Sequence, residues 1–426
     1  MIFRNRIGLY GAYLLGMSGI GFTLPFLPLY LSEKGLSDSQ IGMVSTLAAL
    51  ASLAQFPIGL WADRWQWRKP FLVTALLLLA VATMLLPVAH NIIWLGMLVV
   101  LFAENGICRA VIESLSGAEA ASLATADRVG SALAALRFFR PAGVVVVAIV
   151  GGWWAEAHGV GSILTWLAAL QCLAVVAGLL IHDRNRLART LQSATHTGTK
   201  PGKPGYDRAT WTFIAAMVLF HFCNAPAGVY LGLFMKRDLE APTRMLSFAF
   251  VVSMIAWTLI ARPAGRLADR IGRRPLLIAC WLTMAVRLVL LGMAEASWQV
   301  LAVQVLDGVA SGLFSVLAGT WVIDRLGDAR RVSEAQAVVG TSLVLGSALG
   351  PAAVAPLVEV LGYRGLFGAL AVVGGAATVL LIIALPETLP AGDAPTGIAR
   401  KDGRVSGPPA LAAADTNVIA SMDDHD

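Results

Sequence analysis

Residues 265–275 read GRLADRIGRRP, and residues 59–70 read GLWADRWQWRKP. Both stretches carry a glycine, then an Ala-Asp-Arg triplet, then basic residues and a proline, and their aspartates lie 206 positions apart. A second pair of similar positions follows, because Pro141 and Pro351 lie 210 positions apart. This spacing indicates that the second half of the chain repeats the first, so that one structural unit occurs twice.

The sequence around these loops is strongly apolar. Hydrophobic residues make up 57% of the 426 residues and charged residues 14%, and the mean hydropathy is +0.73. Soluble domains contain roughly 45–50% and 25% of these two classes. A soluble chain of this composition could not cover its surface with polar groups, and a single membrane anchor would not change the composition of the whole chain. We therefore expect an all-α integral membrane protein with many spans.

Twelve segments are long and apolar enough to cross a bilayer, which takes about 20 residues each. The expected spans are 8–31, 39–61, 71–90, 92–113, 131–154, 160–181, 209–235, 244–263, 275–294, 296–322, 334–361 and 363–385. Arg4 and Arg6 precede the first span, as in a signal peptide. The apolar stretch that follows them is too long for a cleaved signal, so we interpret it as an uncleaved span.

Basic residues gather in the loops on one side of this arrangement. They are Arg4, Arg6, Arg64, Arg68, Lys69, Arg184, Arg186, Arg189, Lys200, Lys203, Arg208, Arg262, Arg266, Arg270, Arg273, Arg274, Arg325, Arg330 and Arg331. The loops on the other side carry Lys34, Lys236, Arg237, Arg244 and Arg364. Since lysine and arginine are enriched in cytoplasmic loops, we expect both termini in the cytoplasm. We expect a multi-pass protein of the plasma membrane, of the bacterial inner-membrane type.

Two polar segments divide the chain. Residues 182–208 are polar and rich in glycine and proline, which is typical of a linker, here a cytoplasmic one. Residues 390–426 are rich in Ala, Gly, Asp and Pro without an apolar period, and we expect a disordered cytoplasmic tail. The remaining segments are expected to form an N-terminal six-helix bundle at 1–181 and a C-terminal six-helix bundle at 209–389.

The two loops resemble a motif of a known family. Residues 265–274 are similar to the sequence G-x-L-A-D-R-x-G-R-R, which the major facilitator superfamily carries after its second helix and often again after its eighth. The segments TLPFLPLYL (23–31), GSALGP (346–351) and LPET (385–388) also resemble this superfamily. The resemblance covers about residues 7–390. It implies two pseudo-symmetric six-helix bundles and a secondary transporter that works by alternating access, with its substrate site between the halves.

The residues of the two loops also have a physical interpretation. Glycine lets neighbouring helices approach closely, and an aspartate is favoured near the N-terminus of a helix. The resemblance implies that these loops latch the two halves together on the cytoplasmic side when the protein opens outward. The gating residues would be Gly59, Asp63, Arg64, Arg68, Gly265, Asp269, Arg270, Gly272, Arg273 and Arg274. The alternative is a simple turn with cytoplasmic basic charge, and the first copy departs from the family at Trp61, Gln66 and Trp67.

Two carboxylates lie deep in the expected membrane. Glu104 lies in span four, on the order of 20 Å from its outer end, and Asp307 lies near the middle of the bilayer in span ten, on a helix that is equivalent in the repeat. Ionisable residues at this depth are functional candidates. The resemblance implies that both helices line the central cavity, so we expect these carboxylates to act in proton coupling or substrate binding. The alternative is structural, with Glu104 paired to Arg140 or Arg137 and Asp307 paired to Arg287.

Other polar residues in the spans are candidates for the same site. Arg109 and Glu113 are four positions apart and can pair on one helix face. The arginine that drug:proton antiporters of the family carry in their fourth helix is not at its expected position in this sequence, and Arg109 is a shifted candidate for it. His221 and Asn224 lie in span seven, where Pro226 weakens the helical hydrogen bonding. His221 can bind substrate or carry protons, or it can make a hydrogen bond between helices.

The sequence lacks the motifs of several other function classes. It contains no Walker motif, no HExxH and no GxSxG, so we expect no enzyme activity and no direct use of ATP. The cysteines Cys108, Cys172, Cys223 and Cys280 lie in apolar segments without metal-ligand spacing. The net charge of +6 is distributed over short loops, a pattern that fits a membrane surface better than nucleic acid. We expect no cofactor, no metal and no nucleic-acid partner.

The sequence therefore predicts a secondary transporter of a small organic solute, coupled to protons and acting as a monomer in the lipid bilayer. Efflux is favoured slightly over uptake, although Arg140-Pro141 stands in span five where antiporters of the family have Gly-Pro. One alternative is a proton-coupled uptake symporter for a small metabolite. An alternative of another class is a membrane sensor on the same scaffold that transports nothing.

Overall fold

The chain is helical throughout the part that the structure describes. The computed structural model describes residues 2–65, 67–123, 129–181, 206–326 and 332–388, and these ranges contain helices and turns but no strand. The first half contains α1 (Ile2–Ser18), α2 (Ile20–Glu33), α3 (Asp38–Ala51), η1 (Ser52–Ala54), α4 (Gln55–Arg64), α5 (Arg68–Leu85), α6 (Ile92–Phe102), α7 (Ile107–Ser122), α8 (Val129–His158), η3 (Val160–Ser162) and α9 (Ile163–Leu179). The second half contains α11 (Arg208–Arg237), α12 (Thr243–Ile271), α13 (Arg273–Met293), α14 (Ser297–Leu326) and α15 (Val332–Ala384). The expected linker and tail lie largely outside these ranges.

The described helices account for twelve membrane spans. Ten helical stretches in the described ranges are long and apolar enough to cross a membrane. The last of them, Ala337–Ala384, has 48 residues and turns at Gly362, where a φ of +67° interrupts the helix. Counting the two sides of this turn separately and adding α8, a helix of 30 residues, gives the twelve spans that the hydropathy predicts. The prediction of an all-α membrane fold is confirmed.

Local sequence signals start and end these helices. Ser37 and Gln40 form a capping box at the start of α3, in which each side chain accepts a hydrogen bond from the other residue's backbone amide. Asp207 caps α11 by accepting from the Thr210 amide at 2.9 Å. Gly272, with a φ of +97°, makes the abrupt turn from α12 into α13 in the second motif loop.

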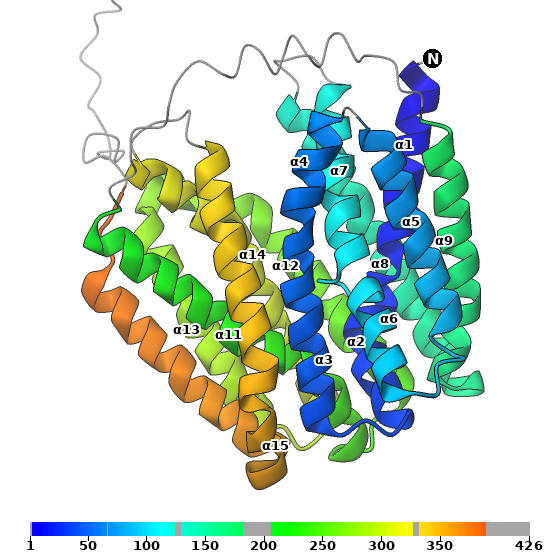
Figure 1. Cartoon of the computed structure of the whole chain (residues 1–426). Helices are drawn as coiled ribbons and strands as arrows, with labels where there is room; N and C mark the ends of the chain where they lie inside the picture. The colour runs from blue at the N-terminus through cyan, green and yellow to red at the C-terminus, as the bar shows by residue number, and fades with distance from the viewer. Residues whose placement is uncertain (1, 66, 124–128, 182–205, 327–331, 389–426) are drawn as a thin grey trace, which may run out of the picture. The chain divides into compact units, whose positions relative to one another are not determined.

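The helices form two groups, one from each half of the sequence (Figure 1). In the first half α1 packs against α8 and α9, and α5 packs against α7 and α9. In the second half α11 packs against α15, and α12 packs against α14. The halves meet where α3 contacts α15, α8 contacts α12 and α2 contacts α11. This arrangement is the pair of six-helix bundles that the repeat predicts.

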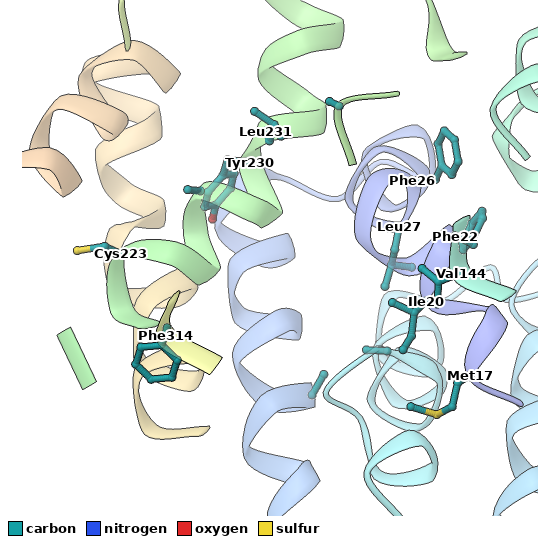
Figure 2. Close-up of a cluster of buried hydrophobic side chains, with 14 of the residues drawn as sticks. Met17, Ile20, Phe22, Phe26, Leu27, Val144, Cys223, Tyr230, Leu231 and Phe314 are labelled. Atoms are coloured by element: carbon teal, nitrogen blue, oxygen red, sulfur yellow. The ribbon is translucent and has the colours of Figure 1, made fainter. Parts of the chain in front are cut away.

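The apolar residues divide between a packed interior and an exposed surface. Figure 2 shows part of the interior, to which the first half contributes Met17, Ile20, Phe22, Phe26, Leu27 and Val144 and the second half Cys223, Tyr230, Leu231 and Phe314. Large apolar side chains also remain exposed along the helices, among them Leu60, Ile93, Leu259, Val360, Val372 and Ile383. An exposed apolar surface of this extent suits lipid as the surrounding solvent.

The helices have two ends that differ in sequence. We name the end that carries both motif loops, at Trp65–Trp67 and Gly272, the motif end. The opposite end, with the loops at residues 34–37 and 238–242, is the far end (Figure 1).

Span four is not one continuous helix. It consists of α6 and α7, and residues 103–106 between them are not helical. Hydropathy predicts the length of a span but does not predict whether its backbone hydrogen bonds continue. The break places Glu104 in irregular backbone at membrane depth, which is tolerated where protein or a water-filled cavity surrounds it.

Candidate functional site

A cavity of about 680 Å³ lies between the two halves. Residues of α2, α3, α7, α8 and the break in span four line it from the first half, and residues of α11 to α15 line it from the second. Aromatic residues Phe220, Phe250, Trp257 and Phe314 form part of the wall on the side of the second half. A cavity of this size, with apolar walls and a few polar groups, suits a small organic molecule.

Glu104 faces this cavity in an ion pair with Arg140. Arg140 Nη2 of α8 lies 2.8 Å from Glu104 Oε1, and Arg140 Nη1 lies 3.7 Å from Glu113 Oε2 of α7. The hydroxyl of Tyr13 donates a hydrogen bond of 2.6 Å to the same oxygen of Glu113. Arg140 is thus shared by two carboxylates, all three lining the cavity. The structure brings Glu104 to Arg140, the structural pairing that the sequence left open beside the coupling role.

Asp307 faces the cavity from the second half, in an ion pair with Arg287. Arg287 of α13 is 1% exposed, and its Nη1 lies 3.0 Å from Asp307 Oδ1. The same nitrogen donates to Asn224 Oδ1 at 2.8 Å, and Nη2 donates to Gln304 Oε1 at 3.2 Å. Ser253 donates to the other oxygen of Asp307. These contacts offset the cost of burying the Arg287 guanidinium.

His221 lies on the cavity wall one turn before Asn224. The residue is 8% exposed, and its ring stands edge-on to Phe314, with ring centroids 4.7 Å apart. Among the described residues, no hydrogen-bond partner reaches His221 Nε2. The hydrogen bond between helices that the sequence left open therefore involves Asn224, through Arg287, and not this nitrogen of His221.

Arg109 lies outside the cavity wall and does not pair with Glu113. It is fully buried, and its Nε donates to the Phe102 carbonyl at 2.7 Å. The i, i+4 spacing suggested a pair with Glu113, but that rule applies to side chains on the exposed face of a continuous helix. Here Glu113 is directed toward Arg140 and Tyr13. The side chain of Arg137 lies outside the described residues.

The second motif loop is held by contacts within its own half. Asp269 is 3.3 Å from Arg273 Nη2, and Arg273 Nε is 3.0 Å from Asp324 at the end of α14. Glu387 accepts hydrogen bonds from the amides of Arg273 and Arg274, at 2.9 and 3.1 Å. The carboxylate at the N-terminus of α13 is therefore Glu387, while the side chain of Asp269 is 71% exposed. The segment LPET resembles the family, but no feature of the sequence predicts this contact of its glutamate.

The first motif loop has a similar local ion pair. Asp63 lies 2.5 Å from Arg68 Nε. A Cβ at Gly59 would approach Ser114 Oγ only to 4.0 Å, and a Cβ at Gly265 would approach Val316 only to 3.8 Å. These are ordinary contacts, so close helix approach does not require either glycine in this conformation. Arg64 and Arg270, the other candidates in the two loops, are exposed.

At the far end, ion pairs join one half to the other. Arg237 Nη1 of α11 is 3.0 Å from both carboxylate oxygens of Asp38 in α3, and it donates to the Tyr363 hydroxyl at 2.6 Å. Arg244 Nη1 of α12 lies 3.3 Å from Glu156 of α8. No local sequence pattern predicts either contact, because each joins positions at least 88 residues apart. The far end is therefore closed in this conformation.

Comparisons with known proteins agree with this arrangement. The model of the MFS_1 like family matches residues 7–357. An uncharacterized MFS-type transporter of Mycobacterium tuberculosis is 28% identical over 389 residues, which cover 86% of this chain and 89% of the relative. The multi-drug resistance efflux pump PmrA of Streptococcus pneumoniae is 24% identical over 371 residues, covering 85% and 91%.

Solved structures show the same fold. The nucleoside transporter NupG superposes with a TM-score of 0.74 at 15% identity, covering 89% of this chain and 97% of that one. A D-xylose-proton symporter superposes with a TM-score of 0.67 at 16% identity, covering 91% and 98%. At these sequence identities the similarity shows the fold alone. It assigns no role to the residues that line the cavity of this chain.

Proposed function

Because the chain belongs to the MFS_1 like family of transporters, we propose that it is a secondary active transporter that moves a small organic solute by alternating access, coupled to protons. The observation that carries this proposal is the cavity between the halves, together with its closure at the far end. A substrate site between two halves that can rock against each other is the basis of alternating access.

The ion pairs of the cavity support proton coupling. Glu104–Arg140 and Asp307–Arg287 each place a carboxylate on the cavity wall beside a guanidinium. Protonation of either carboxylate would release its arginine, and the freed group would favour a different arrangement of neighbouring helices. His221 adds a third group that can exchange a proton with the cavity.

The motif loops are proposed as the second gate. With the far end closed by ion pairs between halves, Asp63 and Asp269 lie in local pairs within their loops. In the opposite conformation these carboxylates would meet a helix N-terminus of the other half and hold the motif end closed. The motif end and both termini are assigned to the cytoplasm from the distribution of basic residues. The proposal includes bundles at 1–181 and 209–389 and a monomer in the inner membrane.

Efflux is the favoured direction. The relatives include a protein whose name describes a multi-drug resistance efflux pump, and the apolar and aromatic cavity wall suits an amphipathic solute. Uptake of a small metabolite is the second candidate, because one structural neighbour is a D-xylose-proton symporter.

Flux measurements in proteoliposomes test the proposal. Purified protein is reconstituted and screened against organic cations, nucleosides, sugars and amphipathic drugs, with a pH gradient of either direction and with a protonophore. Solute flux that follows the gradient and stops with the protonophore supports proton coupling, and its direction separates antiport from symport. Flux that does not depend on the pH gradient overturns the proposal of proton coupling. Absence of flux for every solute, in folded protein, favours the alternative of a membrane sensor that transports nothing.

A further inference from the structure

Span four is interrupted beside the cavity, and the interruption has a defined structure. α6 ends at Phe102 and α7 starts at Ile107. In a continuous helix the Gly106 amide would donate to the Phe102 carbonyl, but here it donates to Ala103 at 2.9 Å. A Cβ at Gly106 would overlap the Val100 carbonyl, so the break requires glycine at this position. Glu104 lies in the middle of the break, and its pairing with Arg140 depends on the course of this backbone.

Arg109 satisfies the carbonyl that the break leaves without its helical partner. Its Nε donates to the Phe102 oxygen at 2.7 Å, across seven positions in sequence. Its guanidinium also lies over the Phe102 ring, with Cζ 4.9 Å from the ring centroid. A buried carbonyl without a partner is costly, so this bond favours the broken conformation over a disordered one.

The terminal part of the Arg109 guanidinium lies beside a second helix break, at Gly19 between α1 and α2. Gly19 joins α1 to α2, and a Cβ there would overlap Arg109 Nη2. Neither Nη1 nor Nη2 of Arg109 has a hydrogen-bond partner among the described residues. The contact with Phe102 is therefore the polar interaction that fixes this fully buried side chain.

We propose that Arg109 is a positioning residue that holds the break in span four and thereby presents Glu104 to Arg140 and the cavity. Among the described side chains, the charged groups around Glu104 are Arg140 of α8 and Arg109 and Glu113 of α7. Arg109 acts through the geometry of the Phe102 carbonyl and ring, so a positive charge alone does not replace it. The effect of Arg109 on transport rests on the proposed function, whereas its effect on the break does not.

The first test measures the break without reference to transport. Hydrogen exchange is followed for the peptide 99–110 in the full-length protein and in Arg109→Gln, Arg109→Lys and Gly19→Ala. We expect exchange to rise by about tenfold or more in all three, since each removes or displaces the guanidinium from Phe102. Gly11→Ala is the matched control in span one, because a Cβ there meets Ala177 at an ordinary 3.5 Å. Unchanged exchange in Arg109→Gln and Gly19→Ala, or full restoration by lysine, overturns the proposal.

The second test asks whether Arg109 acts through Glu104. The pH profile of solute exchange, which continues without a proton gradient, is compared for the unchanged protein, Arg109→Gln, Glu104→Gln and the double variant. We expect Arg109→Gln to shift the profile and to have no further effect when Glu104 is already glutamine. Additive effects overturn the positioning role. If the unchanged protein shows no proton-driven flux, the proposed function fails, and the hydrogen-exchange result still decides the role of Arg109.

Discussion

Arg237 of α11 and Asp38 of α3 join the two halves of the protein at the far end, with Nη1 3.0 Å from both carboxylate oxygens. Arg237 Nη2 also donates to Ser32 at 2.6 Å, and Tyr363 donates to Asp38 at 3.0 Å. The Arg237 guanidinium thus contacts Ser32 before the loop at residues 34–37 and Asp38 after it. It also contacts Tyr363, beside the turn in α15. This cluster must separate before the cavity can open at the far end.

We therefore expect Arg237→Gln to favour opening at the far end. The pair is partly exposed, so its loss is worth about 1 kcal/mol, or roughly a fivefold change in population. The readout is labelling of Ser347→Cys in the cavity by an impermeant thiol reagent applied at the far end, in protein lacking Cys172. The matched control is Glu295→Gln, an exposed carboxylate near the same end. Equal labelling with and without Arg237 would show that this cluster does not hold the far end closed.

Asp207 provides a pH-dependent contact at the motif end. Arg325 and Thr210 donate hydrogen bonds to its carboxylate and lower its pKa. Because the folded-state pKa lies below the unfolded value of about 3.9, the contribution to stability is complete above that pH and falls away as the pH drops below it. We expect Asp207→Asn to keep the helix cap and lose only the ion pair, worth less than about 1 kcal/mol.

Melting temperatures between pH 3 and pH 7 check this prediction. The difference between the unchanged protein and Asp207→Asn should be full at pH 6 and shrink below about pH 4. Asp207→Ala should melt lower than Asp207→Asn at every pH, because it also removes the cap, worth about 1 kcal/mol. A difference that stays constant down to pH 3 would rule out the carboxylate charge as its cause.

Asp269→Asn should impair transport far more than stability. In this conformation the carboxylate is 71% exposed and 3.3 Å from Arg273, so we expect a loss of less than about 0.5 kcal/mol. If the carboxylate holds the motif end closed in the opposite conformation, transport should fall several-fold. Asp324→Asn is the control, because it removes the other carboxylate partner of Arg273 and leaves Asp269 unchanged. Normal transport kinetics in well-folded Asp269→Asn protein would contradict the gating role.

The assignment of sides is tested by labelling cysteines from outside intact cells. Ser193→Cys, in the expected cytoplasmic linker, should react only after the membrane is permeabilised. Glu295→Cys, at the exposed far-end turn between α13 and α14, should react directly. Ser37 is a further far-end position, but it caps α3 and is less suited to substitution. Labelling of Ser193→Cys in intact cells would reverse the proposed topology.

Hydropathy and the repeat predict the fold because they depend on properties of whole segments. Twelve apolar stretches and two motif loops determine the number of spans and their division into halves. The depth of Glu104 and Arg140 follows from the same counting, since a helix rises a fixed distance per residue. The structure places these two residues 2.8 Å apart.

The contacts that the sequence did not predict depend on backbone details or on distant segments. The spacing of Arg109 and Glu113 within α7 predicts a pair, but the break at residues 103–106, before this helix, gives Arg109 a carbonyl to bind instead. The contact of Asp38 with Arg237 joins positions 199 residues apart, with no local pattern to mark it. The role of Glu387 depends on where α15 ends relative to α13.

The two cavity carboxylates are expected to respond differently to neutralisation. Arg287 is 2% exposed in its side chain and has Asp307 as its carboxylate partner in the ion pairs of the second half. Asp307→Asn should leave this guanidinium buried without a counter-charge and lower stability by about 3–5 kcal/mol. Arg140 is 34% exposed in its side chain and keeps Glu113 at 3.7 Å after Glu104→Gln. That substitution should therefore cost clearly less than Asp307→Asn.

Transport measurements then distinguish a role of these two carboxylates in proton coupling from a purely structural role. We propose that proton coupling runs through Glu104 and Asp307, so that Glu104→Gln should abolish gradient-driven accumulation while solute exchange across the membrane continues. Exchange needs the cavity to alternate between the two sides, whereas accumulation also needs a proton to bind in one conformation and leave in the other. For Asp307, the double variant Asp307→Asn with Arg287→Gln removes both charges, which should recover most of the lost stability and isolate the coupling effect. The measurements are melting temperature, solute exchange and proton-driven accumulation for each variant. Full accumulation in Glu104→Gln and in the double variant would show that neither carboxylate carries the coupling.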